Sequence, residues 1–479
     1  MTNSFETVIG LEIHIQLNTA CKAFASDKNE FSNIQNKHIS AITLGLPGTL
    51  PKANIAHVEK GIKLCLALGS DINHKTLFDR KNYFYPDLPK GYQITQDKCP
   101  IGVGGAFNFI SEDSLKTIRI HHMHMEEDAG KTSHDLHEHY SLLDYNRAGT
   151  PLIELVTEPD FRSGQEVHDF LAAIQQLVQY LDISDGNMEE GSIRCDCNVS
   201  VRPIGQLTYG ERCEIKNVNS KKFARQAIIY ESQRQINCLV NGESITKTTM
   251  LFDPNEGVTR PMRKKETEND YRYFPEPDLC PIIISKDKIE SIKRELGWLP
   301  WELIDKLTSL NVSLDDTNKL CEKKAHALYF LELCKQDHGS SPKEIASIIV
   351  NKLIPEVELS GNSIDQIIHE QTLFQFIALY ENDKINKSMA WSKLWPELIY
   401  KGHIDAEKLA NQYNLIMADD QDFLDPIIQD VISSFPDKVK DYRSGKKGLI
   451  GFFMGQVKLK AGNNVNPQTL KDKVEKILS

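Results

Sequence analysis

Apolar residues occupy every second position from Ile9 to Leu17. Because successive side chains of a strand point to opposite faces, this spacing predicts a strand with one buried face. The polar residues Glu12, His14 and Gln16 then share the other face. Such a face can simply be solvated, but a carboxylate and a histidine two residues apart are also a natural pair of metal ligands.

A second strand is predicted over residues 118–128, where the alternation changes phase between Ile120 and Met123. Such a change indicates a β-bulge, a feature that is common beside active sites. The outward and terminal positions beyond the bulge carry His124, Glu126, Glu127 and Asp128. Six of the fifteen histidines lie between residues 121 and 139, which suggests zinc. No thiolate belongs to this cluster, however, and neighbouring carboxylates favour a hard cation such as Mg²⁺ or Mn²⁺.

Glu154 lies within an apolar run, Leu152–Val156. A carboxylate in a buried strand needs a cation or a proton beside it to be tolerated. The cation can be a metal ion or a basic side chain such as Arg147, and the sequence leaves both open.

Mixed charges lie on two further predicted strands. In residues 193–201 the alternation buries Cys195 and Cys197 and leaves Asp196 exposed between Arg194 and Asn198. The same pattern recurs nearby, with three charged residues on one side: Arg212, Glu214 and Lys216. A face of mixed sign can organise phosphates and metal ions together.

The pattern becomes helical in the second half of the chain. An apolar stripe at helical spacing already predicts one core helix over residues 167–181. From about residue 294 glycine and proline become rare, and Ser341 followed by Pro342 is a typical helix start. We find no internal repeat. The prediction is an α+β protein with a mixed-sheet domain over residues 1–293, an all-helical domain over 294–405 and a small helical tail domain over 406–479.

Composition narrows the function classes. The net charge of −11 argues against a general nucleic-acid binder, because phosphate contacts drive such affinity. Residues 434–479 nevertheless carry ten basic and four acidic residues, a surplus of +6 that suits either a solvated face or an RNA contact. No apolar run is long enough to span a membrane, and the scattered cysteines and unremarkable N-terminus favour a reduced, cytoplasmic protein.

Two predicted loops, residues 79–92 and 269–278, combine aromatic and charged side chains. Aromatic rings can stack on unpaired bases while basic groups meet phosphates, which suits a single-stranded tRNA end. The rings can equally anchor the loops to the core. The chain has no GxxxxGK[ST] motif, so a P-loop nucleotide site is excluded.

Taken together, these segments resemble the B subunits of the aspartyl/glutamyl-tRNA amidotransferases over almost the whole chain. The motifs that carry the resemblance are Leu11–His14, Gly45–Pro51, Tyr83–Gln96, Glu126–Lys131, Asp144–Pro151, Met188–Gly191, Arg194–Arg202, Glu214–Asn217, Asp270–Leu279, Tyr442–Lys446 and Gly451–Val457. The resemblance implies a cradle-like catalytic domain that uses ATP to phosphorylate the side-chain carboxylate of Glu-tRNA(Gln) or Asp-tRNA(Asn). Ammonia then displaces the phosphate.

The resemblance also implies partners and site residues. Ammonia would come from a separate glutaminase (amidase) chain, and a small third chain would complete a heterotrimer. Mg²⁺ or Mn²⁺ would be held by His14, Glu126, Glu127, Glu154 and Asp196, with Glu12 as a further catalytic residue. ATP would be contacted by Lys90, Arg194, Arg212, Glu214 and Lys216. Many relatives have a cysteine-rich, zinc-knuckle-like segment before Gly45, whereas residues 24–44 contain no cysteine, so no structural zinc is predicted.

Two other functions use the same features. One is a metal-dependent phosphohydrolase that needs no tRNA, and the other is a non-catalytic tRNA-binding scaffold. A hydrolase would cleave simple phosphoesters unaided, whereas a scaffold would tolerate the loss of His14 or Glu154.

Overall fold

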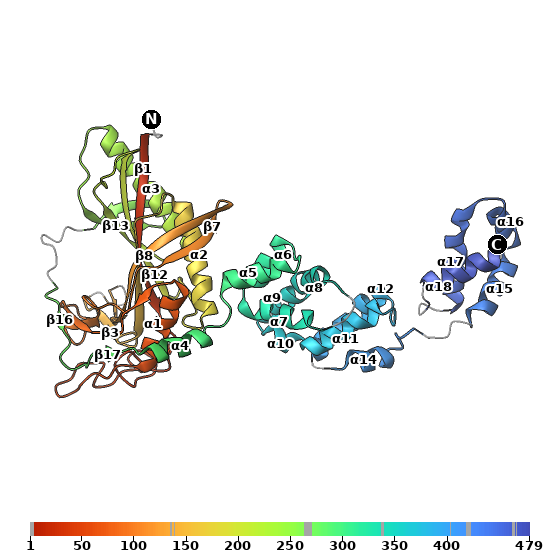
Figure 1. Ribbon diagram of the computed structural model, residues 1–479, viewed down its shortest axis with the longest axis horizontal. Coiled ribbons are helices and arrows are strands. Elements are labelled where there is room, and N and C mark those ends of the chain that lie inside the picture. Colours follow the sequence, from red (N-terminus) through yellow and green to blue (C-terminus); the bar gives the residue numbers. More distant parts are fainter. Residues whose placement is uncertain are drawn as a thin grey trace. The chain divides into compact units, whose positions relative to one another are not determined.

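The computed structural model describes residues 4–134, 137, 139–262, 271–336, 340–402, 404–417, 423–461, 465 and 467–479. It divides into two compact units, Met1–Pro300 and Trp301–Ser479 (Figure 1). Asn269 and Asp270 of the second predicted aromatic loop lie outside the described residues. The domain boundaries predicted at 293 and 405 stay predictions.

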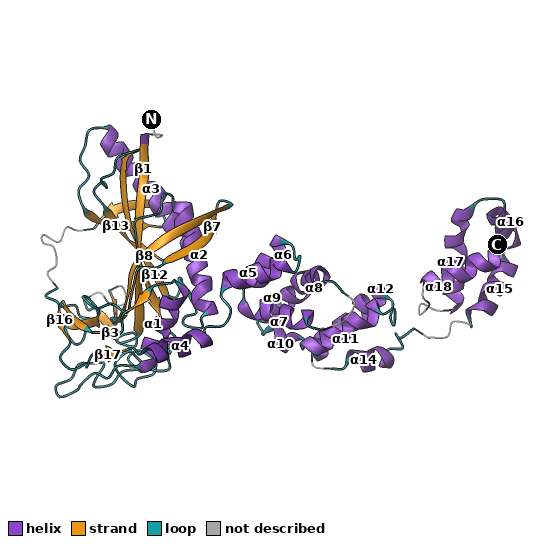
Figure 2. Cartoon of the chain, in the orientation of Figure 1, coloured by secondary structure: helices purple, strands orange, loops and turns teal. Residues whose placement is uncertain are grey.

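The first unit is built on a ten-stranded mixed sheet (Figure 2). Its strands are β1 (Phe5–Gln16), β2 (Asp71–Ile72), β6 (Gly102–Val103), β7 (Ala106–Ser111), β8 (Ser114–Glu127), β11 (Pro151–Thr157), β12 (Ile193–Pro203), β13 (Cys213–Val218), β14 (Thr248–Asp253) and β15 (Val258–Pro261). Their order is β15-β14-β13-β12-β1-β11-β8-β6-β2, and β7 pairs with β8 off this path. The neighbours are antiparallel except β13 and β14, which are parallel.

The smaller sheets are formed by β4 (Asp79–Asn82), β5 (Tyr92–Thr95) and β16 (Phe274–Pro275), by β9 (Lys131–Ser133) and β10 (Leu142–Asp144), and by β3 (Lys75–Thr76) and β17 (Ile282–Ile283). The first of these brings the two aromatic loops together, since Phe274 pairs with Arg80 across β16 and β4. The loops are therefore held partly by the sheet itself.

The predicted alternation of β1 and the predicted bulge of β8 are both present. Ile9, Leu11, Ile13, Ile15 and Leu17 are at most 1% exposed. On β8, His122 pairs with Val156 and Ile120 pairs with Thr157, so one extra residue separates the two pairs. Met123 and Met125 are fully buried beyond that bulge. The apolar and polar faces of the central strands are thus clearly separated.

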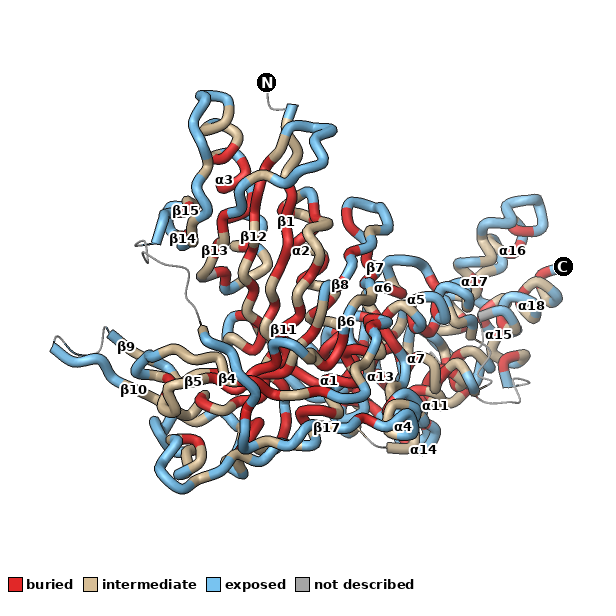
Figure 3. The backbone as a smooth tube through the Cα atoms, turned by 60° about the vertical axis from the view of Figure 1, so that its left-hand side comes forward, coloured by how far each residue is buried: buried red, intermediate tan, exposed pale blue. Residues whose placement is uncertain are grey.

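Helices cover the apolar face of the sheet in Figure 1. They are α1 (Ile55–Ala67), α2 (Gly164–Tyr180) and α3 (Lys221–Val240), and α4 (Lys286–Glu295) packs beside α1. Phe170 of α2 meets the rings of Phe107 and Phe161 edge-on, and a Cβ at Gly61 of α1 would lie 3.3 Å from Ile153 Cδ1. Burial is concentrated along these strands and helices in Figure 3. The opposite, polar face of the sheet is left for chemistry.

The second unit is helical, which confirms the predicted α+β class. Its elements are α5 (Pro300–Ser309), α6 (Leu314–Cys321), α7 (Lys324–Cys334), α8 (Pro342–Ile348), η2 (Ile349–Leu353), α9 (Ile354–Ser360), α10 (Ile364–Ile367), α11 (Glu370–Glu381), α12 (Lys387–Met389), η3 (Ala390–Leu394), α13 (Trp395–Lys401), α14 (Ala406–Gln412), α15 (Leu424–Ser434), α16 (Pro436–Arg443), η4 (Lys447–Leu449), α17 (Ile450–Ala461) and α18 (Pro467–Leu478). Ser341 and Glu344 form a reciprocal capping box at the predicted helix start. Helices α15 to α18 share their own core around Phe453, Val457 and Leu470. Among the described residues, no helix combines the length and apolarity that crossing a membrane requires.

A short internal repeat in this unit was missed by the sequence analysis. The five-residue π-helices η2 and η3 each end at a leucine, which begins the segment Leu-Ile-Pro-Glu after η2 and Leu-Trp-Pro-Glu after η3. Pro355 and Pro396 occupy equivalent places in the two segments. Proline lacks an N–H and its ring crowds the preceding turn, and a π-turn accommodates this without ending the helix. Each segment then stops at a glycine with positive φ, Gly361 or Gly402.

Candidate functional site

The polar face of the sheet aligns side chains from neighbouring strands in rows. In one row, His14 of β1 lies between Arg194 of β12 and Glu154 of β11, and Glu154 is paired in turn with His124 of β8. In the next row, Glu12 is paired with Asp196. Side chains of directly paired residues lie close together, so the register alone brings these groups into contact.

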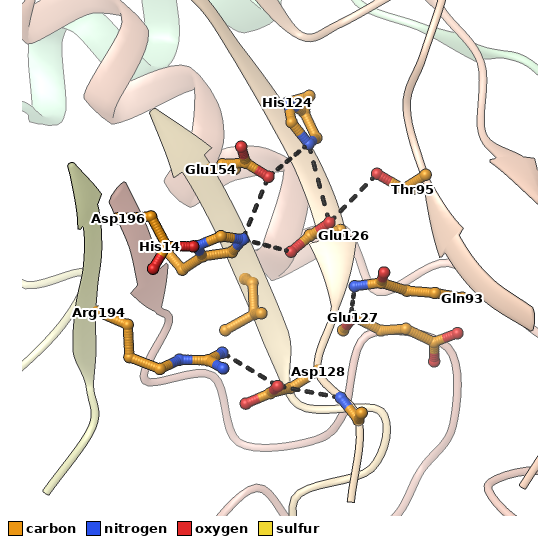
Figure 4. A network of polar contacts seen from close by, with 12 residues as sticks. His14, Gln93, Thr95, His124, Glu126, Glu127, Asp128, Glu154, Arg194 and Asp196 are labelled. Atoms are coloured by element: carbon orange, nitrogen blue, oxygen red, sulfur yellow. Dashed lines mark hydrogen bonds and ion pairs between the residues drawn. The ribbon is translucent and has the colours of Figure 1, made fainter. Parts of the chain in front are cut away.

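The centre of the site is a group of three side chains (Figure 4). His14 Nε2 lies 3.3 Å from Glu126 Oε1 and 3.2 Å from Glu154 Oε2. His124 joins them, with its Nε2 3.1 Å from Glu154 Oε2 and 3.8 Å from Glu126 Oε2. The two imidazoles therefore bridge the two carboxylates. Thr95 Oγ1 of β5 donates a further hydrogen bond of 3.3 Å to Glu126.

Burial makes this group electrostatically unusual. The carboxylates of Glu126 and Glu154 are only 3% and 11% exposed. Burial disfavours an imidazolium, but hydrogen bonds to the two carboxylates outweigh it and raise the pKa of His14 to about 10. The same balance raises the pKa of His124 to about 9. Protonated imidazoles would offset the charge of the two buried carboxylates. A bound divalent cation would take over that role, with the ring of His14 neutral.

The donor set fits a divalent cation. Ligand atoms of His14, Glu126 and Glu154 all lie within 4.8 Å of one another. Two carboxylates with one imidazole suit Mg²⁺ or Mn²⁺ better than zinc, which prefers nitrogen and sulfur. The Nδ1 atom of His124 is buried without a hydrogen-bond partner among the described residues. The alternation of β8 predicts the outward face of His124 but does not mark it as a site residue.

Glu127 belongs to a different contact set. Its carboxylate forms an ion pair with Lys90 and accepts a hydrogen bond of 3.0 Å from the N–H of Ile94. Gln93 donates to the carbonyl oxygen of Glu127 at 2.7 Å. The structure thus pairs two predicted residues, Lys90 and Glu127. They are separate from the His14 group, because Glu126 contacts His14 whereas Glu127 contacts Lys90.

Asp128 holds two guanidinium groups. Arg147 Nη2 lies 2.5 Å from its Oδ2, and Arg194 Nη2 lies 3.0 Å from its Oδ1. Arg147, one alternative partner that the sequence left open for Glu154, is therefore bound to Asp128 instead. Because Arg194 is also the cross-strand partner of His14, this ion pair lies directly beside the central group.

A second charged cluster lies in the neighbouring row. Lys216 Nζ lies 2.7 Å from Asp196 Oδ2 and 2.8 Å from Glu214 Oε1. Asn198 donates to Glu12 at 2.9 Å. Burial, followed by repulsion from Glu154, raises the pKa of Glu12. Asp196 is thus neutralised by a lysine rather than joined to His14.

Arg212 differs from the other residues predicted for nucleotide contact. It is exposed just before β13, and the described residues include no contact that joins it to this cluster. The predicted roles of Arg212, Glu214 and Lys216 stay predictions.

Comparison with known proteins covers both units. Residues 7–290 match the model of the GatB/GatE catalytic domain, and residues 328–478 match that of the GatB domain. Curated B subunits of aspartyl/glutamyl-tRNA(Asn/Gln) amidotransferases are similar throughout. The one from Bdellovibrio bacteriovorus is 40% identical over 480 residues, covering 100% of this chain and 98% of its own. Those from Syntrophotalea carbinolica and Desulfotalea psychrophila are 41% and 42% identical, and each alignment covers at least 99% of both chains.

Proposed function

The chain belongs to the family of the aspartyl/glutamyl-tRNA(Asn/Gln) amidotransferase B subunits, and we propose that it phosphorylates the side-chain carboxylate of Glu-tRNA(Gln) or Asp-tRNA(Asn) and then aminates it. The carboxylate oxygen attacks the γ-phosphorus of ATP, ADP leaves, and an acyl phosphate forms. Ammonia then attacks the acyl carbon, phosphate leaves, and the ammonia nitrogen gives up one proton. The products are Gln-tRNA(Gln) or Asn-tRNA(Asn), ADP and phosphate.

The observation that carries this proposal is the buried His14–Glu126–Glu154 group. These three residues would hold Mg²⁺ or Mn²⁺, and when bound the ion would supply charge neutralisation for the ATP phosphates. Phosphoryl transfer depends mainly on positioning and charge neutralisation, which a rigid central sheet can provide. His124 would orient Glu154 from the side opposite His14.

The remaining charged groups would arrange the nucleotide. Arg194 lies beside His14 with its guanidinium fixed by Asp128, so it can meet a phosphate without first being ordered. We assign Lys216, Glu214 and Asp196 to the same region, with Lys90 on the Glu127 side and Arg212 at the edge. Glu12 and Asp196 would serve as secondary carboxylates beside the phosphates.

The proposal includes partners. The sequence has no glycine-serine-rich amidase motif, so ammonia would come from a separate glutaminase chain, with a small third chain completing a cytoplasmic heterotrimer. Residues 294–405 and 406–479 would bind the tRNA, which gives the +6 surplus near the C-terminus a function.

Reconstitution tests the function directly. The chain is combined with its glutaminase partner and the small third chain, and is supplied with ATP, glutamine and each misacylated tRNA in turn. We expect amide formation on at least one tRNA, and failure with both contradicts the proposal. When the nitrogen donor is omitted and hydroxylamine is added, an ATP-dependent hydroxamate reports the acyl phosphate.

A further inference from the structure

Two histidines that the proposed function does not use, His121 and His122, are neighbours in β8. Adjacent residues of a regular strand point to opposite faces, but a bulge changes this. Here His122 pairs with Val156 and Ile120 pairs with Thr157, so His121 is the extra residue of the bulge. As a result the two side chains meet, with their Nδ1 atoms 2.6 Å apart and their ring centroids 4.9 Å apart.

The surrounding strands hold this pair in place. The carbonyl oxygen of His121 accepts a hydrogen bond of 3.1 Å from the N–H of Gly104, and His122 is the cross-strand partner of Val103 in β6. The ring of His122 is half-buried and stacks on that of His124, with centroids 5.3 Å apart and an angle of 18° between the planes. His121 is exposed to solvent. One ring is therefore fixed by packing, and the other closes over it from the solvent side.

The contact between the two nitrogens can be a hydrogen bond, because a neutral imidazole has one donor and one acceptor nitrogen. It is also close to the geometry of a chelate. A metal ion that binds each nitrogen at about 2.0–2.1 Å, with the right angle of square-planar or octahedral coordination, separates the nitrogens by about 2.9 Å. Replacing the shared proton by such an ion opens the pair by only about 0.3 Å. Tetrahedral coordination, which zinc prefers, requires a wider separation of about 3.4 Å.

The chemistry of the pair favours the same ions. Burial, reinforced by the neighbouring imidazoles, lowers the pKa of His122 to about 4, so that its ring binds a metal at neutral pH without first losing a proton. Two imidazoles without a carboxylate suit Cu²⁺ and Ni²⁺, whereas Mg²⁺ requires oxygen ligands. Within the part of the chain that the structure describes, the only set of three closely spaced ligand residues is the His14 group, so water would complete the coordination at the histidine pair.

We propose that His121 and His122 form a chelating site for a transition-metal ion with right-angled coordination, Cu²⁺ or Ni²⁺, separate from the magnesium or manganese site of the His14 group. With only two protein ligands, the ion exchanges readily. His124 lies between the two sites, because its ring stacks on His122 and its Nε2 contacts Glu154. Strand β8 thus contributes to two metal sites of different chemistry.

Calorimetric titration of the full-length chain with Ni²⁺ tests the site. Excess Mg²⁺ is present throughout, because it competes for the carboxylates of the His14 group but not for two imidazoles. We expect His121→Ala to weaken Ni²⁺ binding by at least about tenfold, since one of two ligands is lost. His134→Ala is the matched control, because it removes another exposed histidine, whose Nδ1 contacts the hydroxyl of Ser141 at 2.8 Å. This control and Glu126→Gln, which alters only the His14 group, should leave the affinity unchanged.

A second measurement uses the wild-type chain alone. Diethyl pyrocarbonate modifies accessible imidazoles, and peptide mass spectrometry locates the modified residues. We expect saturating Ni²⁺ to protect His121 from modification. His74 is the internal control, since it is also exposed but contacts only the carbonyl oxygen of Ile284, and its modification should be unchanged by Ni²⁺.

Three results would overturn the proposal. The first is wild-type Ni²⁺ affinity in His121→Ala. The second is a loss of affinity in His134→Ala or Glu126→Gln without a loss in His121→Ala, because the ion then belongs to another group. The third is modification of His121 at an undiminished rate in saturating Ni²⁺, which decides the matter even where His121→Ala is impaired in folding.

Discussion

His14 and Glu154 are cross-strand partners in β1 and β11, and the imidazole Nε2 lies 3.2 Å from Oε2 of the carboxylate. The pairing is enforced by the register of two hydrogen-bonded strands whose other face is core. A shift of either strand by one residue would turn that strand's polar side chain into the core, so the register is strongly specified. The sheet therefore fixes the separation of two candidate metal ligands before any ion binds.

Replacing Glu154 is expected to abolish the first chemical step. Glu154→Gln keeps the shape of the side chain but removes the negative charge, and we expect acyl phosphate formation to fall by more than about 100-fold, beyond the effect typical of losing an outer partner of a ligand. The measurement is hydroxamate formation from misacylated tRNA and ATP without a nitrogen donor. Glu158→Gln, just past the end of β11, is the control and should retain activity. Normal hydroxamate formation by Glu154→Gln would support the scaffold alternative instead.

Adjacent glutamates should differ in metal binding. Glu126 lies in the buried group with His14, whereas Glu127 is paired with Lys90. We therefore expect Glu126→Gln to weaken Mn²⁺ binding by at least about tenfold and Glu127→Gln to change it little. Loss of the free Mn²⁺ electron paramagnetic resonance signal measures the binding without any need for activity. Equal losses in both variants would mean that Glu127 is also a ligand, as the sequence analysis expected.

The alternation of apolar and polar residues predicted part of the candidate site. Alternation placed His14 and Glu126 on the polar faces of their strands, and Glu154 stood out as a carboxylate within an apolar run. The change of phase beyond Ile120 located the bulge. Periodicity cannot choose between Glu126 and Glu127, because the choice depends on partners from distant segments. Lys90 is 37 residues from Glu127, and nothing in the local sequence of either residue indicates their pairing.

The missed features have the same cause. His124 was assigned to the outward face, but its contact with Glu154 depends on the pairing of β8 with β11. The ion pair of Arg147 with Asp128 likewise depends on how the strand ends and the following turn meet. The repeat around Pro355 and Pro396 was missed because only one short segment of each copy is similar in sequence, whereas the π-turns make the equivalence visible.

The segment before Gly45 should be stable without zinc. Asp27 accepts hydrogen bonds from the hydroxyls of Ser40 and Thr43, and the buried Lys22 donates to the carbonyl oxygen of His38 at 2.5 Å. These contacts join both ends of the segment, as a metal would. We expect less than stoichiometric zinc by elemental analysis and no change in Tm after chelation. Asp27→Asn should lower the free energy of unfolding by about 1–3 kcal/mol, because a charged acceptor of two hydrogen bonds is lost. A chelator-sensitive Tm would contradict this.

Acid should destabilise the protein through His57. The ring of this α1 residue is 1% exposed and its Nε2 contacts the carbonyl oxygen of Leu152 at 2.9 Å. Burial, only partly offset by that hydrogen bond, lowers the pKa of His57 to about 4. Above the ordinary pKa of about 6.5, the ring is neutral in both the folded and the unfolded chain, and it adds no pH dependence. Between about 6.5 and 4 only the unfolded chain binds the proton, so stability falls as the pH falls, by up to about 1.4 kcal/mol per pH unit.

The variant that isolates this effect is His57→Gln, whose side-chain amide can still donate to Leu152 but does not titrate. Urea unfolding of the full chain is followed by circular dichroism at pH 7, 6 and 5, for the wild type and the variant. We expect the difference in unfolding free energy between the two proteins to shift in favour of the variant as the pH decreases. His74→Gln is the control, since that histidine also contacts a backbone carbonyl, of Ile284, but is exposed. Parallel pH profiles for the wild type and His57→Gln would show that the buried ring takes up its proton without cost to the fold.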